Sequence, residues 1–140
     1  MARRKIRPPQ KSGKTGTRFS AAEPPRDYNE QCFSIRFDCA SGYCIFDCNQ
    51  DQQISALKTI HDLSKVKWKE LMKVHKHGKG FEKINRSSIK RIRSLNHVPI
   101  DQEKFIAFRF CGKAPMVGYR DQDKFVVYWF DRDFSLYDHG

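Results

Sequence analysis

The chain has 140 residues, 39% of them hydrophobic, and a formal net charge of +11 at pH 7. This length is typical of one domain with a modest core. No run approaches the length of a membrane-spanning apolar helix, and the basic start of the chain leads into no apolar stretch typical of a secretory signal. We therefore expect a cytoplasmic protein with no membrane partner.

The positive charge is concentrated in two parts of the sequence. Residues 1–18 contain seven Lys and Arg and no acid, and residues 65–93 contain eleven Lys and Arg against only Glu70 and Glu82. The remainder of the chain is slightly acidic. Such an asymmetry favours a polyanionic partner, above all a nucleic acid.

The first 28 residues differ in composition from the rest of the chain. They are rich in Pro, Gly, Ser, Lys and Arg and show no hydrophobic periodicity. This composition predicts a disordered basic arm over 1–28, followed by a single domain over 29–140. The arm is interpreted either as an electrostatic tether to nucleic acid or as a solvated tail.

The first half of the domain predicts one hairpin and two helices. Apolar residues alternate with polar ones from residue 33 and resume after a Gly-containing turn, which predicts a β-hairpin over 31–48. Residues 50–63 are predicted to be helical, with Asn49 or Asp51 as the cap and four apolar residues at three-residue spacing, Ile54, Leu57, Ile60 and Leu63. A second helix is expected after Ser64, with an apolar stripe that includes Trp68, Leu71, Met72 and His75.

The second half of the domain predicts mainly strands. Residues 81–84 are expected to form a short edge strand, and 87–95 a further helical turn or two. Residues 104–111, 116–120 and 124–131 are predicted strands with short connections, which favours an antiparallel meander. The predicted fold class is α+β. Its small antiparallel sheet combines this C-terminal meander with the N-terminal hairpin, and two or three helices pack on one face.

The five cysteines contain no CxxC pair. An odd number in a cytoplasmic chain predicts free thiols rather than a disulfide framework. A zinc site built from Cys39, Cys44 and Cys48 is an alternative. We expect neither a metal nor a cofactor.

The basic stretch is the predicted nucleic-acid-binding surface, because neutralising many phosphates requires a high density of cations. A solvated helix face is the alternative interpretation. The predicted contact residues are Lys67, Lys69, Lys73, Lys76, His77, Lys79, Lys83, Arg86, Lys90, Arg91 and Arg93.

A second group of residues suggests catalysis. Alternation along the strands predicts that Arg109 and Arg120 project from the same sheet face, and the chain ends nearby in Tyr137 and His139. Metal-free RNA cleavage requires a base for the 2′-hydroxyl proton, cations for the phosphorane charge, and an acid for the leaving oxygen. These four residues are the predicted catalytic set. Ion pairs with neighbouring aspartates are the alternative role for the two arginines.

Two segments together resemble a known family. They are FDCNQDQQISALKTIHDLSKVKWKELMK and FRFCGKAPMVGYRDQDKFVVYWFDRDFSLYDHG. In order and pattern, about residues 43–140 resemble the small bacterial RelE/ParE-like toxins and related mobile-element proteins. The basic arm and the extra strand expected at 31–39 depart from the family pattern.

The resemblance implies a sheet with two helices on one face and a concave RNA-binding face on the other. RelE-like members cleave mRNA without metal, usually on the ribosome, and have a cognate antitoxin partner. The positions that match their catalytic set are Arg109, Arg120, Tyr137 and His139. The first hypothesis is therefore a toxin with endoribonuclease activity. The alternatives are a non-enzymatic nucleic-acid-binding module and a ParE-like inhibitor of a protein such as gyrase.

Overall fold

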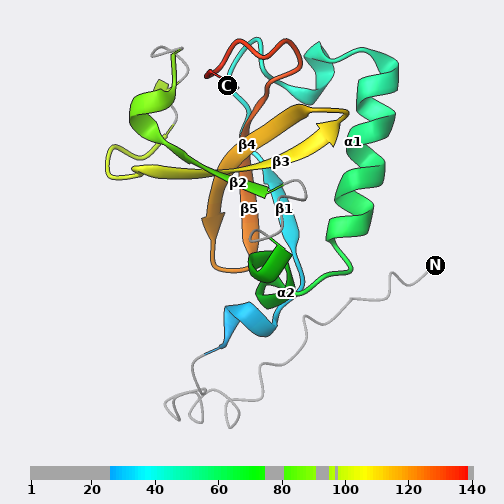
Figure 1. Ribbon diagram of the computed structural model, residues 1–140, viewed down its shortest axis with the longest axis vertical. Helices are drawn as coiled ribbons and strands as arrows, with labels where there is room; N and C mark the ends of the chain where they lie inside the picture. The colour runs from blue at the N-terminus through cyan, green and yellow to red at the C-terminus, as the bar shows by residue number, and fades with distance from the viewer. Residues whose placement is uncertain (1–25, 75–80, 91–94, 97, 139–140) are drawn as a thin grey trace, which may run out of the picture.

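The computed structural model describes residues 26–74, 81–90, 95–96 and 98–138. These form a five-stranded mixed sheet with two α-helices, which confirms the predicted α+β class (Figure 1). The sheet order is β1-β5-β4-β3-β2, with β1 parallel to β5 and all other neighbours antiparallel. In chain order the elements are η2 (Tyr28–Glu30), β1 (Ser34–Phe37), η3 (Ile45–Asp47), α1 (Gln50–Leu63), α2 (Trp68–Val74), β2 (Phe81–Asn85), η5 (Arg86–Ser88), β3 (Lys104–Cys111), β4 (Ala114–Asp121) and β5 (Lys124–Phe130).

The predicted C-terminal meander is confirmed, and so is the edge strand. Strands β3, β4 and β5 are joined by two-residue turns, and β2 pairs antiparallel with β3 at the edge of the sheet. The pairing of β4 with β5 shifts register between Val117 and Gly118. At that point Gly118 lies directly against the β5 backbone, where an added Cβ would fall 1.9 Å from the carbonyl oxygen of Val126.

The predicted N-terminal hairpin is wrong. Only Ser34–Phe37 forms a strand, and it pairs in parallel with β5 instead of with residues 43–48. The chain then turns over residues 40–43, and β5 holds this turn by two backbone hydrogen bonds. The Ala40 N–H donates to the Tyr128 oxygen, and the Phe130 N–H donates to the Tyr43 oxygen. Strand β5 is buried at six of its seven positions, as is typical of a strand inside a sheet with a neighbour on each side. It therefore pairs with Ser34–Phe37, which the alternation pattern had paired with residues 43–48.

Helix α1 has the predicted bounds, and its start is fixed by local hydrogen bonds. Asn49 and Gln52 form a capping box, in which each side chain accepts from the other residue's backbone N–H at 2.8 and 2.9 Å. The apolar stripe is rotated relative to the prediction: Ala56 is fully buried, whereas Leu57 is 66% exposed. Three-residue spacing drifts around a helix of 3.6 residues per turn, so the four predicted positions do not share one face.

Both faces of the sheet are buried over its central strands β4 and β5. One face packs against α1 and α2 through a core that includes Trp68, Phe108 and Phe125. The other face, expected to be an open concave surface, is covered by Ile89, Val98 and the C-terminal segment. The cause lies in β5, whose run KFVVYWF is apolar at six consecutive positions and leaves no face that tolerates water.

The predicted basic arm lies outside the described residues except for 26–28, and Tyr28 is the first residue of η2. In the described part of the chain, neither helix has the length or apolar character needed to cross a bilayer.

Candidate functional site

Arg109 and Arg120 lie on opposite faces of the sheet, so their expected common face is wrong. Gly118 pairs with Ile106, and Arg120 lies two residues beyond Gly118 on that same face, against Trp68. Arg109 alternates with Phe108 and shares the other face with Ala107. The alternation of faces within each strand was correctly predicted. Which face of one strand matches which face of the next depends on the turn between them and on the irregularity between Arg109 and Cys111.

Arg120 is bound within the fold. Its guanidinium carbon lies 4.4 Å from the centre of the Trp68 ring, which is a cation–π contact. Its Nη2 donates to Asn29 at 2.9 Å and its Nε donates to the Gln122 carbonyl at 2.6 Å. Burial lowers the pKa of this arginine. These contacts join η2, α2 and the β4–β5 turn, which is a structural role.

Tyr137 is a buried side chain on the second face, only 4% exposed. Its hydroxyl donates to Oε2 of Glu82 at 3.4 Å. Burial first, and then the negative charge of Glu82, raises the pKa of Tyr137 well above its usual range. The phenol therefore stays protonated near neutral pH and acts as a donor, not as a base.

Glu82 is the residue that sequence reasoning missed. It pairs with Ala107 across the β2–β3 ladder, so it shares the face of Arg109, two residues farther along β3. Diagonal neighbours of this kind lie within reach of long side chains. Glu82 and Arg109 are both exposed. We call Glu82, Arg109 and Tyr137 the Glu82 cluster. The sequence could have revealed this cluster if the predicted edge strand at 81–84 had been paired with the predicted strand at 104–111, because that pairing brings Glu82 next to Arg109.

The C-terminal segment is anchored beside this cluster. The buried carboxylate of Asp131 accepts the backbone N–H groups of Ser135 at 2.9 Å and Leu136 at 3.2 Å. Lys90 forms an ion pair with Asp138, and its backbone N–H donates to the Leu136 oxygen at 2.8 Å. His139, the remaining predicted catalytic residue, lies outside the described residues.

The predicted basic contact residues have varied surroundings. Lys67 and Lys69 both bind Glu30, Lys73 pairs with Glu70, and Arg86 donates to the carbonyls of Pro99 and Gln102. Lys90 pairs with Asp138, as described above. Within the described ranges, Lys83 has no side-chain hydrogen bond or ion pair in the structure. The others, Lys76, His77, Lys79, Arg91 and Arg93, lie outside the described residues.

The excess positive charge of the chain falls almost entirely outside the described fold. The described residues contain 16 Lys and Arg and 15 Asp and Glu, a net charge of +1. The remaining +10 belongs to residues 1–25, 75–80 and 91–94. The last two segments flank β2 and η5 in the sequence, so they bracket the strand that carries Glu82.

Glu30 links the entry of the chain to α2. Its carboxylate lies 2.7 Å from Nζ of Lys69 and 3.2 Å from Nζ of Lys67, and these two lysines, Lys69 first, lower its pKa below 4.5. A lowered pKa in the folded state means stability that is present at neutral pH and lost as pH falls through that pKa.

We expect Glu30→Gln to lower the urea midpoint slightly at neutral pH, because it removes an exposed ion pair. Urea unfolding of both proteins at neutral pH and well below pH 4.5 checks this, and the two midpoints should converge at the lower pH. High salt should reduce the neutral-pH difference. A difference that grows on acidification would contradict this role of Glu30.

In the described part of the chain no three His, Cys, Asp or Glu side chains are grouped to hold a metal ion, and all five cysteines are free thiols. The chain matches no protein-family model, no curated protein and no solved structure.

Proposed function

We propose that this protein binds RNA and cleaves it at the Glu82 cluster, as a RelE-like toxin. The observation that carries the proposal is the placement of an exposed carboxylate, Glu82, and an exposed guanidinium, Arg109, on one sheet face. Tyr137 adds a neutral hydroxyl hydrogen-bonded to the carboxylate. Such a set supplies a base, a cation and a hydrogen-bond donor without a metal ion.

The cluster suggests a division of roles. Glu82 takes the proton of the ribose 2′-hydroxyl, whose oxygen then attacks the adjacent phosphorus. Arg109 stabilises the negative charge that develops on the phosphoryl oxygens, while the hydroxyl of Tyr137 orients the Glu82 carboxylate. The bond from phosphorus to the 5′-oxygen breaks, and that oxygen takes a proton. His139 follows Asp138 directly in the chain, so it is the candidate acid for this step.

RNA binding is assigned to the basic segments that bracket β2. Residues 75–80 and 91–94 add four cations next to a fold whose described part is nearly neutral. The segment 75–80 leads directly into β2 in the sequence, which is the reason for assigning phosphate binding to it. As a toxin acting on mRNA, the protein would work in the cytoplasm and would have a cognate inhibitor, which we expect to be acidic.

The test is cleavage of single-stranded RNA and of mRNA on translating ribosomes by purified full-length protein. Glu82→Gln is expected to slow cleavage by about 10²–10⁴-fold, because it removes the base but keeps the shape. Arg109→Ala is expected to slow it by about 10²–10³-fold. Both side chains are exposed, so the melting temperatures should remain close to that of the wild type.

Matched controls separate the cluster from general charge effects. Glu103→Gln and Lys113→Ala make the same charge changes at exposed positions outside the cluster and should cleave normally. If Glu82→Gln cleaves as fast as the wild type, the nuclease proposal fails. If the wild type binds RNA but cleaves it neither free nor on ribosomes, a non-enzymatic binding module is the function.

That second function is favoured by the charge distribution alone, and it has its own test. Replacing Lys76 and Lys79 by alanine together should weaken RNA binding and reduce the slope of log affinity against log salt by about 1.4 for a single strand. Affinity titrations at several salt concentrations measure this slope.

The matched control for that titration is the double variant Lys58→Ala, Lys113→Ala. It removes two exposed lysines from α1 and from the β3–β4 turn. Its salt slope should stay at the wild-type value. Equal losses in the two double variants would assign binding to overall charge rather than to the segment at 75–80.

A further inference from the structure

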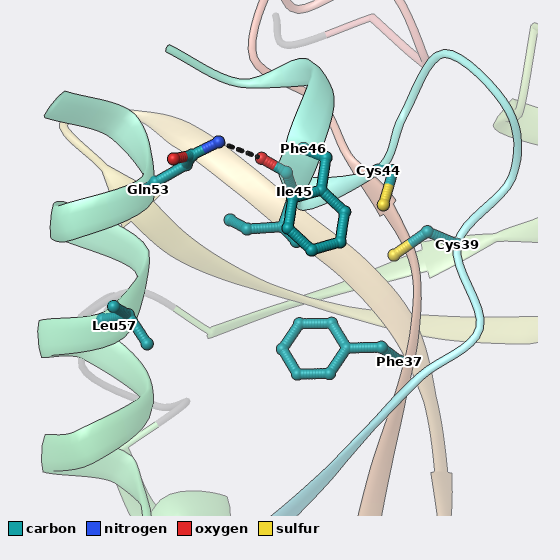
Figure 2. A pocket seen from close by; sticks show the side chains of 7 residues that line it. All are labelled: Phe37, Cys39, Cys44, Ile45, Phe46, Gln53 and Leu57. Atoms are coloured by element: carbon teal, nitrogen blue, oxygen red, sulfur yellow. Dashed lines mark hydrogen bonds between the residues drawn. The ribbon is translucent and has the colours of Figure 1, made fainter. Parts of the chain in front are cut away.

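A pocket of about 510 Å³ lies between β1, η3 and α1, on the opposite side of the sheet from the Glu82 cluster. Gln53 closes one end by donating to the carbonyls of Ile45 and Cys48, both at 3.1 Å, which ties η3 to α1. Figure 2 shows the lining residues, which are Phe37, Cys39, Cys44, Ile45, Phe46, Gln53 and Leu57. Because Phe46 is 86% exposed and Leu57 66% exposed, solutes reach the pocket from outside.

Two thiols share one wall of this pocket. Cys39 follows β1 and Cys44 precedes η3, and Figure 2 shows their sulfur atoms pointing toward one another. The turn between them is fixed, because the Ala40 N–H donates to the Tyr128 oxygen at 2.9 Å and the Tyr43 N–H donates to the Ala40 oxygen at 3.0 Å. Both thiols are half-buried and free. The fold therefore holds a pair of facing thiols beside an accessible cavity.

We propose that Cys39 and Cys44 form an oxidation site, at which a low-molecular-weight disulfide converts the two thiols into an intrachain disulfide. The thiolate of Cys44 attacks one sulfur of glutathione disulfide, breaks its S–S bond and releases one glutathione. Cys39 then loses its proton to solvent and attacks the Cys44 sulfur, which releases the second glutathione. Two protein thiols are oxidised and one disulfide is reduced to two thiols.

The order of attack follows from the surroundings of Cys39. Burial first, and then the nearby Cys44, raises the pKa of Cys39 to about 12, so this sulfur is protonated near neutral pH. Only the thiolate is nucleophilic, which leaves the first attack to Cys44 and makes the second step slow. A mixed disulfide between Cys44 and glutathione should therefore accumulate before the intrachain bond forms.

The turn between Cys39 and Cys44, which the disulfide would bridge, also contacts the C-terminal segment that covers the other face of the sheet. The hydroxyls of Tyr43 and Ser135 lie 3.0 Å apart, and Arg132 donates to the Gly42 oxygen at 2.7 Å. The turn therefore supports the chain just before Leu136 and Tyr137. A crosslink across it restricts the unfolded chain, so the oxidised protein should melt at a higher temperature than the reduced protein.

The test treats the reduced full-length protein with glutathione disulfide and maps its peptides over time. Cleavage before aspartate releases residues 38–46, which contain Cys39 and Cys44 and no other cysteine. The expected product is this peptide two hydrogens lighter than its reduced form, preceded by its glutathione adduct. After chymotrypsin cuts behind Tyr43, the oxidised peptide should remain one covalent species.

Two variants sharpen the result. Cys44→Ser should form neither the adduct nor the intrachain bond in this peptide, whereas Cys32→Ser, which changes an exposed thiol elsewhere, should behave as the wild type. Circular dichroism checks that both variants fold. The peptide mapping of the wild-type protein tests the proposal even if a variant does not fold. A stable adduct at Cys44 that never resolves, or a bond from Cys44 to Cys48, would overturn the proposal.

Discussion

Replacing Gly118 with alanine is expected to destabilise the fold by about 3 kcal/mol or more. The added Cβ would lie 1.9 Å from the carbonyl oxygen of Val126 and 2.8 Å from its carbon. Both are backbone atoms of a central strand, so neither can rotate away as a side chain can. The change must therefore separate β4 from β5 at the place where their register shifts.

Urea unfolding followed by tryptophan fluorescence measures this effect, because Trp68 and Trp129 are both fully buried. The midpoint should fall by roughly 1–3 M. Gly42→Ala is the matched control: its φ is +83°, and an added Cβ meets nothing within 4 Å. We expect that variant to lose only about 1 kcal/mol, from backbone strain. Equal losses in the two variants would refute the contact with Val126.

Asp131→Ala is expected to cost about 3 kcal/mol and to release the C-terminal segment from the sheet. The carboxylate is fully buried and accepts the backbone N–H groups of Ser135 and Leu136. Without it, both donors lose the acceptor that these hydrogen bonds provide, and the Leu136 donor is left in an apolar core. Urea unfolding gives the stability, and hydrogen exchange at the Leu136 amide reports the release of the segment.

The neighbouring Asp133→Ala is the control for charge and position. Asp133 is exposed and its carboxylate accepts from the Ser135 hydroxyl at 2.7 Å, so its loss should cost about 0.5 kcal/mol or less. The Leu136 amide should exchange as slowly as in the wild type. If the two variants were equally stable, Asp131 would not be what holds the segment in place.

Local signals in the sequence were sufficient for the elements whose partners are close along the chain. Asn49 and Gln52 fix the start of α1, and the short turns of the last three strands fix the meander. The hairpin at 31–48 failed because alternation reports how a strand is buried and not which strand it pairs with. The true partner of Ser34 is Lys124, and no local pattern contains that information.

The candidate site was harder to predict than the fold. Arg109 could be identified from the sequence because it is a charged residue within an apolar strand. Glu82 could not, because it lies in a lysine-rich stretch that was interpreted only as a cationic surface. Arg120 has the same signature as Arg109, yet its contact with Trp68 and its bond to Asn29 make it structural. Tyr137 was correctly placed next to the sheet, but its burial depends on Ile89 and Val98, which cover that face.

The parallel pairing of β1 with β5 has a consequence for the timing of folding. The paired residues Ser34 and Lys124 are ninety positions apart in the chain, so this contact has a high sequence separation and closes late. At a synthesis rate of about 5–20 residues per second, β1 waits roughly 5–18 s for its partner to be made. During that interval Ile35 and Phe37 have no strand to pair with, so the nascent chain depends on its helices or on chaperones to stay out of aggregates.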